Sequence, residues 1–301
     1  MGLDPEIIIL IPCGPHSGDN AIEAAESVEA YSRIPYEIVF VDDCTEDGTY
    51  EKLFSQKRHC WHIVRSRKRN KYARLVQTLS LGYRYINRSL SGRCILKMDT
   101  DALVTGHGIF KEALAFMDAN RSVGMYGVFR TDFNRKRSFA THANQINAET
   151  TLWRRVLHRA PSWLDLLRRA ESNGYKRGEN VFGGAYFITR KCLQAIDKLG
   201  GLDVPYNWHS RLAEDVYFSM ATVAAGYTLG HFAAPEGPLC MEHRGLPYPA
   251  REIVARGYKI THSVDNGPNT GPVENDGVSA REAFRDIRKQ VKDEFGSGRS
   301  M

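Results

Sequence analysis

The order of apolar and helical segments in the first hundred residues is the feature that most constrains the fold. Four short runs rich in Ile, Val and Leu have the length of buried strands, at residues 6–12, 36–41, 61–64 and 94–98. The stretches between them carry helical patterns, at residues 19–32, 48–56 and 75–86. Strands that alternate with helices predict an α/β fold with a mainly parallel central sheet and helices on both of its faces.

Acidic residues stand where two of these predicted strands end. Asp42 and Asp43 follow the second strand, and the triplet Asp99-Thr100-Asp101 follows the fourth. Ligands of open α/β sheets bind beyond the carboxyl ends of the strands, and hard divalent cations prefer carboxylate and phosphate oxygens. The sequence therefore predicts a site for Mn2+ or Mg2+ and a diphosphate at this edge, although such a triplet by itself is also typical of a turn or a helix cap.

Composition limits the classes of protein that remain. The chain has 301 residues, 42% of them hydrophobic and 25% charged, which is typical of a soluble globular protein with a full core. Its formal net charge of +6 suits an anionic ligand and is too small to predict a nucleic-acid partner. Lysine and arginine gather in residues 65–74, where phosphate contact, a membrane surface and a solvated basic face are all open interpretations.

Three features bear on the location of the protein. The six cysteines lie far apart without a C-x-x-C pair, as expected of reduced thiols. The first predicted strand begins at residue 6, which leaves no room before it for a signal peptide. No uninterrupted apolar stretch approaches the ~18 residues of a membrane span. We therefore expect a cytoplasmic protein, with peripheral membrane association as the open alternative.

Four segments resemble, in the same order, motifs of family 2 glycosyltransferases with the GT-A fold. These segments are residues 37–49 (EIVFVDDCTEDGT), 99–101 (DTD), 183–187 (GGAYF) and 213–216 (AEDV). The first departs from the family's V-D-D-G-S-x-D-G-T pattern at Cys44, which replaces the usual glycine, and at Glu46, where Ser or Thr is common. The resemblance implies a metal-dependent inverting glycosyltransferase that moves a sugar from a nucleotide-diphosphate sugar, most readily a UDP- or GDP-sugar, to a hydroxyl acceptor.

The resemblance also implies roles on the donor side. Asp43 would accept a hydrogen bond from the nucleotide base, while Asp42 has capping of the following turn as its alternative role. Asp101 would bind the divalent metal, with His243 as a candidate further ligand because neutral imidazole suits Mn2+. At Pro12 the backbone would approach the donor's base or ribose. Asp99 would contact the ribose or a metal-bound water, and Lys71 and Arg74 would contact the diphosphate.

On the acceptor side the resemblance implies that Asp215 is the catalytic base, which takes the proton of the attacking hydroxyl. Its neighbour Glu214 would position the acceptor or cap the helix, since acidic residues also favour helix N-termini for electrostatic reasons alone. Gly184 lies in the predicted acceptor-side strand, and Trp208 is placed to stack on a sugar or to pack in the core. Residues 150–173 match no family segment, and we expect them to shape the acceptor site.

The same patterns predict how the chain is divided. Residues 1–263 are expected to form a single GT-A-like catalytic domain, whose nucleotide-sugar-binding half gives way to an acceptor-side half at about residue 130. Residues 264–301 are expected to form a loop rich in Gly, Pro and Asn and then a helix. Ser279 and Glu282 predict a capping box at the start of that helix, whose apolar stripe would dock on the core.

Other classes of function remain open from the sequence alone. A nucleotidyltransferase shares the α/β scaffold and a carboxylate-held metal, although the chain has no glycine-rich basic loop directly after its first strand. A retaining glycosyltransferase is also compatible with the D-x-D triplet, whereas Glu214-Asp215, the E-D pair, favours inversion. The non-enzymatic alternative is an inactive sugar-nucleotide-binding protein, against which the intact Asp101 and Asp215 argue.

Overall fold

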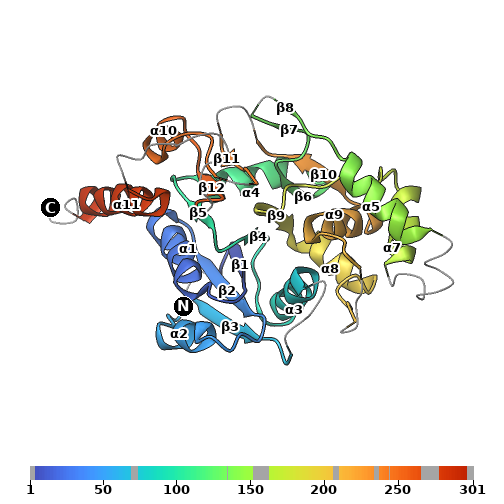
Figure 1. Ribbon diagram of the computed structural model, residues 1–301, viewed down its shortest axis with the longest axis horizontal. Coiled ribbons are helices and arrows are strands. Elements are labelled where there is room, and N and C mark those ends of the chain that lie inside the picture. The colour runs from blue at the N-terminus through green and yellow to red at the C-terminus, as the bar shows by residue number, and fades with distance from the viewer. Residues whose placement is uncertain are drawn as a thin grey trace.

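A computed structural model describes residues 4–68, 74–133, 135–151, 163–205, 210–233, 237–243, 245–265 and 278–296. A seven-stranded sheet forms the centre of the molecule, with helices on both of its faces (Figure 1). Its strands follow the order β10 (Thr228–His231), β6 (Val123–Gly127), β9 (Ala185–Thr189), β4 (Cys94–Met98), β1 (Ile7–Cys13), β2 (Tyr36–Asp42) and β3 (Trp61–Arg65). Only β9 runs antiparallel to its neighbours in this sheet, so the predicted α/β fold with a mainly parallel sheet is confirmed.

The part of the sheet formed by β1 to β4 follows the sequence prediction closely. The helices that connect these strands are α1 (Gly18–Tyr31), α2 (Thr49–Ser55) and α3 (Arg74–Ser89). In the parallel register, Cys13 of β1 pairs with Asp42 of β2, so both strands end at the same edge. This edge is where the polar ends of the strands come together, as the sequence indicated.

Later elements complete the sheet and cover it. The helices of this part are α4 (Ile109–Ala119), α5 (Ala140–Thr150), α7 (Leu164–Ser172), α8 (Arg190–Lys198), α9 (Glu214–Ala224), α10 (Ala250–Ala255) and α11 (Ala280–Gly296). A second sheet has the order β11 (Leu239–Cys240), β12 (Ile260–His262) and β5 (Ala102–Val104), and β7 (Thr131–Asp132) pairs with β8 (Arg135–Lys136). The sequence patterns did not reveal β5, β6 or the second sheet, because these strands are too short for a clear period. The helix α4 was also missed, although its buried residues Ile109, Phe110, Ala113 and Leu114 have helical spacing.

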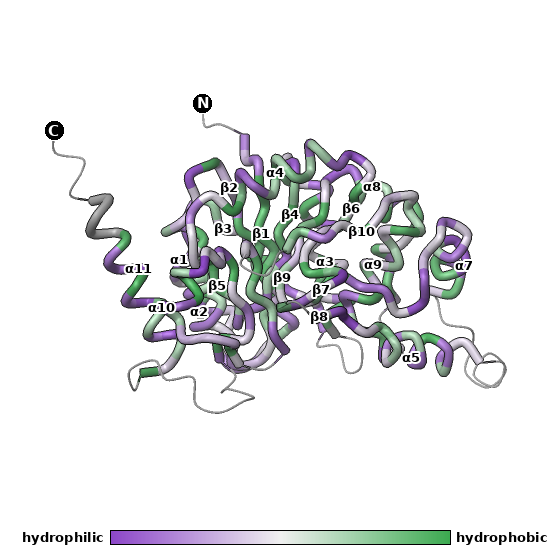
Figure 2. The backbone as a smooth tube through the Cα atoms, turned by 90° about the horizontal axis from the view of Figure 1, so that it is seen from above, coloured by the Kyte–Doolittle hydropathy of each residue, from purple (hydrophilic) through white to green (hydrophobic). Residues whose placement is uncertain are grey.

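The core has two layers, one on each face of the central sheet. Ile7, Ile9 and Ile11 point to the face covered by α1 and α4, whereas Ile8 and Leu10 point to the face covered by α3, α8 and α9. Figure 2 shows the central strands as the most hydrophobic part of the chain. Alternate side chains of one strand are thus buried on opposite faces, which is why its sequence is apolar throughout.

The predicted C-terminal helix, α11, begins at the expected residue pair. The backbone N–H of Ser279 donates to Glu282 Oε2 at 3.0 Å, and the N–H of Glu282 donates to Ser279 Oγ at 3.2 Å. This reciprocal pair is the predicted capping box. Phe284 lies in the core on one side of this helix, so the expected docking of its apolar stripe is confirmed for that residue.

Arginines of α11 also bind a buried carboxylate of α1. Arg281, Arg285 and Arg288 all donate to the carboxylate of Glu23, which is 6% exposed. Burial raises the pKa of Glu23, but hydrogen bonds from these arginines outweigh that effect and hold it below its usual value. Arg281 donates in addition to the backbone oxygen of Thr100 at 3.0 Å, so α11 contacts the D-x-D triplet directly.

None of the helices in the described part of the chain combines the length and the apolar character that crossing a bilayer requires. All six cysteines are free thiols, and four of them are buried.

Candidate active site

The turn after β2 is stabilised by Asp42 rather than left open for a ligand. Thr45 Oγ1 donates to Asp42 Oδ1 at 2.6 Å, and Arg65 Nε lies 3.1 Å from Asp42 Oδ2. Asp42 is fully buried, so its role as a cap of this turn is confirmed. Cys44 has a φ of 55°, in the left-handed region, which explains why a glycine is common at this position of the motif.

Asp43 lies beside the end of β1. Its backbone N–H donates to Cys13 O at 3.1 Å, and Thr78 Oγ1 of α3 donates to its carboxylate at 3.2 Å. Pro12 stands one residue before Cys13 in β1, where it pairs with Val41. The structure therefore brings Pro12 and Asp43 to one edge of the sheet, while their contacts with a nucleotide stay a prediction.

Three side chains form a candidate metal site at the end of β4. Asp99, Asp101 and His262 each offer a ligand atom, and these atoms all lie within 4.8 Å of one another. His262 Nε2 is 3.3 Å from Asp101 Oδ1 and 3.8 Å from Asp99 Oδ2. The antiparallel pairing of β12 with β5 places His262 opposite Ala102, the residue directly after the triplet. The histidine is thus brought in from far along the chain.

The orientation of the His262 ring suits a metal ligand. Its Nδ1 lies 2.7 Å from the backbone oxygen of Glu242, and because a carbonyl oxygen only accepts, Nδ1 carries the proton. In the neutral imidazole, Nε2 then presents a lone pair toward Asp99 and Asp101, an arrangement typical of metal-binding histidines. When Nε2 is protonated, it donates instead to Asp101. Burial lowers the pKa of His262, but this hydrogen bond and the charge of Asp101 outweigh burial and raise that pKa, so a cation at the site would displace the Nε2 proton.

Gly184 makes the close approach of these groups feasible. A Cβ atom at this position would overlap the imidazole ring of His262. The backbone oxygen of Gly184 accepts a hydrogen bond from the N–H of Asp99 at 2.9 Å. Gly184 therefore contacts two of the three candidate ligands, and its predicted contact with an acceptor stays a prediction.

The E-D pair stands in the first turn of α9. Asp215 is 8% exposed; Asn180 Nδ2 donates to its Oδ2 at 2.5 Å, and the N–H of Val216 donates to its Oδ1 at 2.8 Å. Burial, together with the negative charge of Glu214, raises the pKa of Asp215 to about 7. A carboxylate with such a pKa can accept a proton near neutral pH, as a general base must.

A buried lysine connects the two acidic pairs, and the sequence prediction missed it. Lys97 Nζ lies 2.6 Å from Asp99 Oδ1 and 3.4 Å from Glu214 Oε1. The signal was present, since Lys97 is the one charged residue in an otherwise apolar strand. A charge in a buried strand has to be paired, and this pairing points to a site.

The remaining predicted residues are not members of this group or lie outside the described residues. His243 is not in the candidate metal group; its ring packs on Phe182 with centroids 4.6 Å apart, and His262 takes the place predicted for it beside Asp101. Lys71 and Trp208 lie outside the described residues. Arg74 is the first residue of α3, and its side chain is not described.

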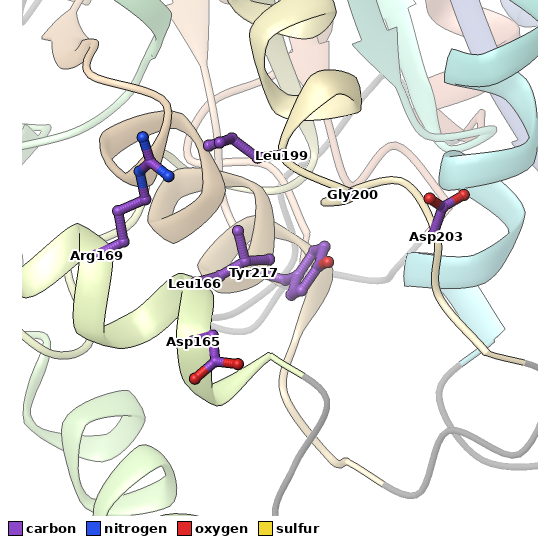
Figure 3. A pocket seen from close by; sticks show the side chains of 7 residues that line it. All are labelled: Asp165, Leu166, Arg169, Leu199, Gly200, Asp203 and Tyr217. Carbon is purple, nitrogen blue, oxygen red and sulfur yellow. The ribbon is translucent and has the colours of Figure 1, made fainter.

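A cavity of about 260 Å3 lies elsewhere, between α7 and the start of the segment after α8. Figure 3 shows its lining, which consists of Asp165, Leu166, Arg169, Leu199, Gly200, Asp203 and Tyr217. Tyr217 donates to the backbone oxygen of Gly201 at 2.7 Å, which fixes one wall. None of the lining residues belongs to the candidate metal group or the E-D pair, so the cavity is separate from the proposed chemistry.

The sequence profile described as Glycosyl transferase family 2 matches residues 9–191, which is more than half of the chain. The chain therefore belongs to glycosyl transferase family 2. The matched range includes the strand ends of β1 and β2, the D-x-D triplet and β9. No curated protein matches the chain in sequence.

Solved structures of distant sequence are similar to part of this chain. The mannosyltransferase PcManGT from Pyrobaculum calidifontis, in complex with GDP-Man and Mn2+, is 14% identical with a TM-score of 0.46, covering 76% of this chain and 55% of that one. S. aureus TarS residues 1–349 are 14% identical with a TM-score of 0.42, covering 75% of this chain and 58% of that one. A longer TarS structure is 17% identical with a TM-score of 0.44, covering 75% and 35%. The chain thus spans little more than half of these proteins, or less.

Proposed function

We propose that this protein is a metal-dependent, inverting glycosyltransferase, and that it moves a sugar from a UDP- or GDP-sugar to a hydroxyl acceptor. The observation that carries the proposal is the presence of two acidic sites, one that faces a histidine and one that holds a buried carboxylate with a raised pKa. Asp99 and Asp101 face His262 in a group that could hold a cation. Asp215 is buried nearby on α9 with its pKa raised to about 7 by burial and by the charge of Glu214.

The donor set of the first site fits Mn2+ or Mg2+. Two carboxylates and one imidazole supply oxygen and nitrogen ligands, and a diphosphate would complete the coordination shell. A bound divalent cation would neutralise the charge that develops on the departing nucleoside diphosphate. Asp99, Asp101 and His262 would hold that cation, while the donor contacts predicted for Pro12 and Asp43 would orient the nucleotide.

Asp215 would act on the acceptor. As the acceptor oxygen forms its bond to the anomeric carbon, the bond from that carbon to the diphosphate oxygen breaks on the opposite face, and the hydroxyl proton passes to the Asp215 carboxylate. The hydrogen bonds from Asn180 and Val216 hold this carboxylate in one orientation, and each oxygen keeps a further acceptor site. Glu214 and Gly184, with Trp208, are the residues proposed to line the acceptor. Lys71 and Arg74 remain the proposed diphosphate contacts.

The test is a donor screen that measures nucleotide release from UDP-, GDP- and dTDP-sugars with Mn2+ and with EDTA. Titration calorimetry with UDP and GDP should show binding that depends on Mn2+, and binding of equal strength in EDTA would overturn the metal dependence. NMR of the product then compares its anomeric configuration with that of the donor. Retention of configuration would overturn the inverting assignment.

The role of Asp215 has its own test. Asp215→Asn should keep Mn2+-dependent nucleotide binding and lose turnover by about 10²- to 10⁴-fold, the range of general-base contributions. The matched control is Asp19→Asn, because Asp19 is also the second residue of a helix but is exposed and pairs with Lys52. Asp19→Asn should keep full turnover. Unchanged turnover in Asp215→Asn would remove Asp215 as the base.

A further inference from the structure

Lys97 is a charged residue in a fully buried strand of the central sheet. The strand β4 lies between β1 and β9, and the other four residues of β4 are apolar. The Lys97 side chain is 0% exposed. Burial of an ammonium group is strongly unfavourable unless the group is both paired and hydrogen-bonded, so this lysine needs a reason to be there.

The ammonium group has acceptors for all three of its protons. Nζ lies 2.6 Å from Asp99 Oδ1, 2.6 Å from the backbone oxygen of Gly183 and 3.4 Å from Glu214 Oε1. A lysine has three N–H donors, and these three acceptors satisfy them. The acceptors come from three different elements: the end of β4, the segment before β9 and the first turn of α9.

The backbone around Lys97 leaves the ammonium little freedom. Lys97 pairs with Leu10 in β1 and with Tyr186 in β9, so it stands on the central strand of the sheet. Its Nζ lies 5.6 Å from the centre of the Tyr186 ring. Gly183 lies close to Glu214, since a Cβ atom on Gly183 would come within 2.6 Å of Glu214 Oε1. A side chain on a rigid element is well suited to fix the geometry of a site.

We propose that Lys97 is a positioning residue that couples the two acidic pairs, holding Asp99 in place for the cation and Glu214 in place beside the base. This inference rests on the proposed metal-dependent function. Without the ammonium, Asp99 and Glu214 would face each other as like charges with no donor between them, and their side chains would move apart. Asp99 would then leave the position from which it faces Asp101 and His262, which would weaken the cation site. The effect of Lys97 on the metal site therefore depends on the charge of Glu214.

Lys97→Met keeps the length of the side chain and removes its charge. We expect it to weaken Mn2+-dependent UDP or GDP binding by about 10- to 100-fold, the range for residues that support metal ligands, and to lower kcat as well. Lys52→Met is the matched control, because Lys52 pairs with Asp19 on the surface. Lys52→Met should bind the nucleotide with Mn2+ as tightly as the unchanged protein.

The coupling itself is measured by a double-mutant cycle with Glu214→Gln, read out by Mn2+-dependent nucleotide binding. In the Glu214→Gln background no unpaired carboxylate remains opposite Asp99. The loss of affinity that Lys97→Met causes should therefore be at least about tenfold smaller in that background than in the unchanged protein. A merely structural lysine would produce the same loss in both backgrounds. If Lys97→Met alone does not fold, the double variant is compared directly with Glu214→Gln, and a small difference supports the coupling.

Three further outcomes test the positioning role and separate the inference from the proposed function. Leu193→Ala removes a buried side chain of α8 and lowers stability without changing a charge. Equal losses of affinity in Leu193→Ala and Lys97→Met, at equal losses of melting temperature, would overturn the positioning role. If nucleotide binding needs Mn2+ in the unchanged protein and is equally strong in Lys97→Met, the inference is overturned and the proposed function stands. Absence of Mn2+-dependent binding in the unchanged protein would overturn the proposed function.

Discussion

The two acidic pairs of the site contain the same chemical group in different surroundings. The Asp99 and Asp101 side chains are 26% and 23% exposed and face His262, whose hydrogen bond and charge outweigh burial and lower the pKa of Asp101. Asp215 is buried at the start of α9 beside Glu214, and burial with that neighbouring charge raises its pKa to about 7. Burial raises the pKa of Asp99. Asp101 is therefore suited to stay anionic and bind a cation, and Asp215 to accept a proton.

This difference shows how one fold can separate two roles of a carboxylate. A nearby cationic partner favours the charged form, whereas desolvation and a like charge disfavour it. Pairs of carboxylates whose pKa values are driven apart by their environment are typical of enzymes that need both an ionised group and a proton acceptor. Each prediction below changes one side of the site and asks whether the other side responds.

The largest effect is expected from His262, the ligand that the sequence did not indicate. His262→Ala removes one of three candidate ligands and should weaken Mn2+-dependent nucleotide binding by about 100-fold. This is the upper end of the loss for residues that only support metal ligands, which a ligand itself should reach. His243→Ala is the matched control, because His243 packs on Phe182 and lies outside the group. Calorimetry in Mn2+ and in EDTA measures both variants. A larger loss in His243→Ala would return the metal role to His243.

The pH dependence tests the base side. Because the pKa of Asp215 is raised to about 7 by burial and by Glu214, against the lowering charges of Arg137 and Lys97, the carboxylate is protonated below that pH. The value of kcat/KM should then fall about tenfold for each pH unit below 7 and level off above it. Nucleotide binding measured over the same range shows whether the donor side contributes. A flat profile from pH 5 to 8 would contradict the role of Asp215.

The smallest effect is expected from the glycine behind the metal ligands. Gly184→Ala forces the His262 ring aside, and the low end of the penalty for overpacking, about 1 kcal/mol, corresponds to Mn2+-dependent binding that is about fivefold weaker. Gly92→Ala is the control, since its Cβ would meet Ile8 at 2.6 Å, before β4 rather than after it. Gly92→Ala should lower the melting temperature and leave binding intact. Equal losses of binding in both variants would mean that Gly184 acts through stability alone.

Local patterns predicted the first half of the sheet well. The strands β1, β2, β3 and β4 and the helices between them appear within a few residues of the predicted ranges, because each is set by its own apolar period. The capping box at Ser279 and Glu282 was also readable, since its two hydrogen bonds join residues three positions apart. Short elements such as β5 and β12 carry too few residues for a period, and they were missed.

By itself, the sequence determined the alternation of strands and helices, the acidic residues at the strand ends and the acidic start of α9. These features depend on neighbours in the chain, so composition and spacing reveal them. Only the tertiary structure decided that His262, rather than His243, joins Asp99 and Asp101, because β12 pairs with the strand that follows the triplet. It also decided that Lys97 lies between both acidic pairs, since burial in the sheet forces its charge onto carboxylates from separate elements.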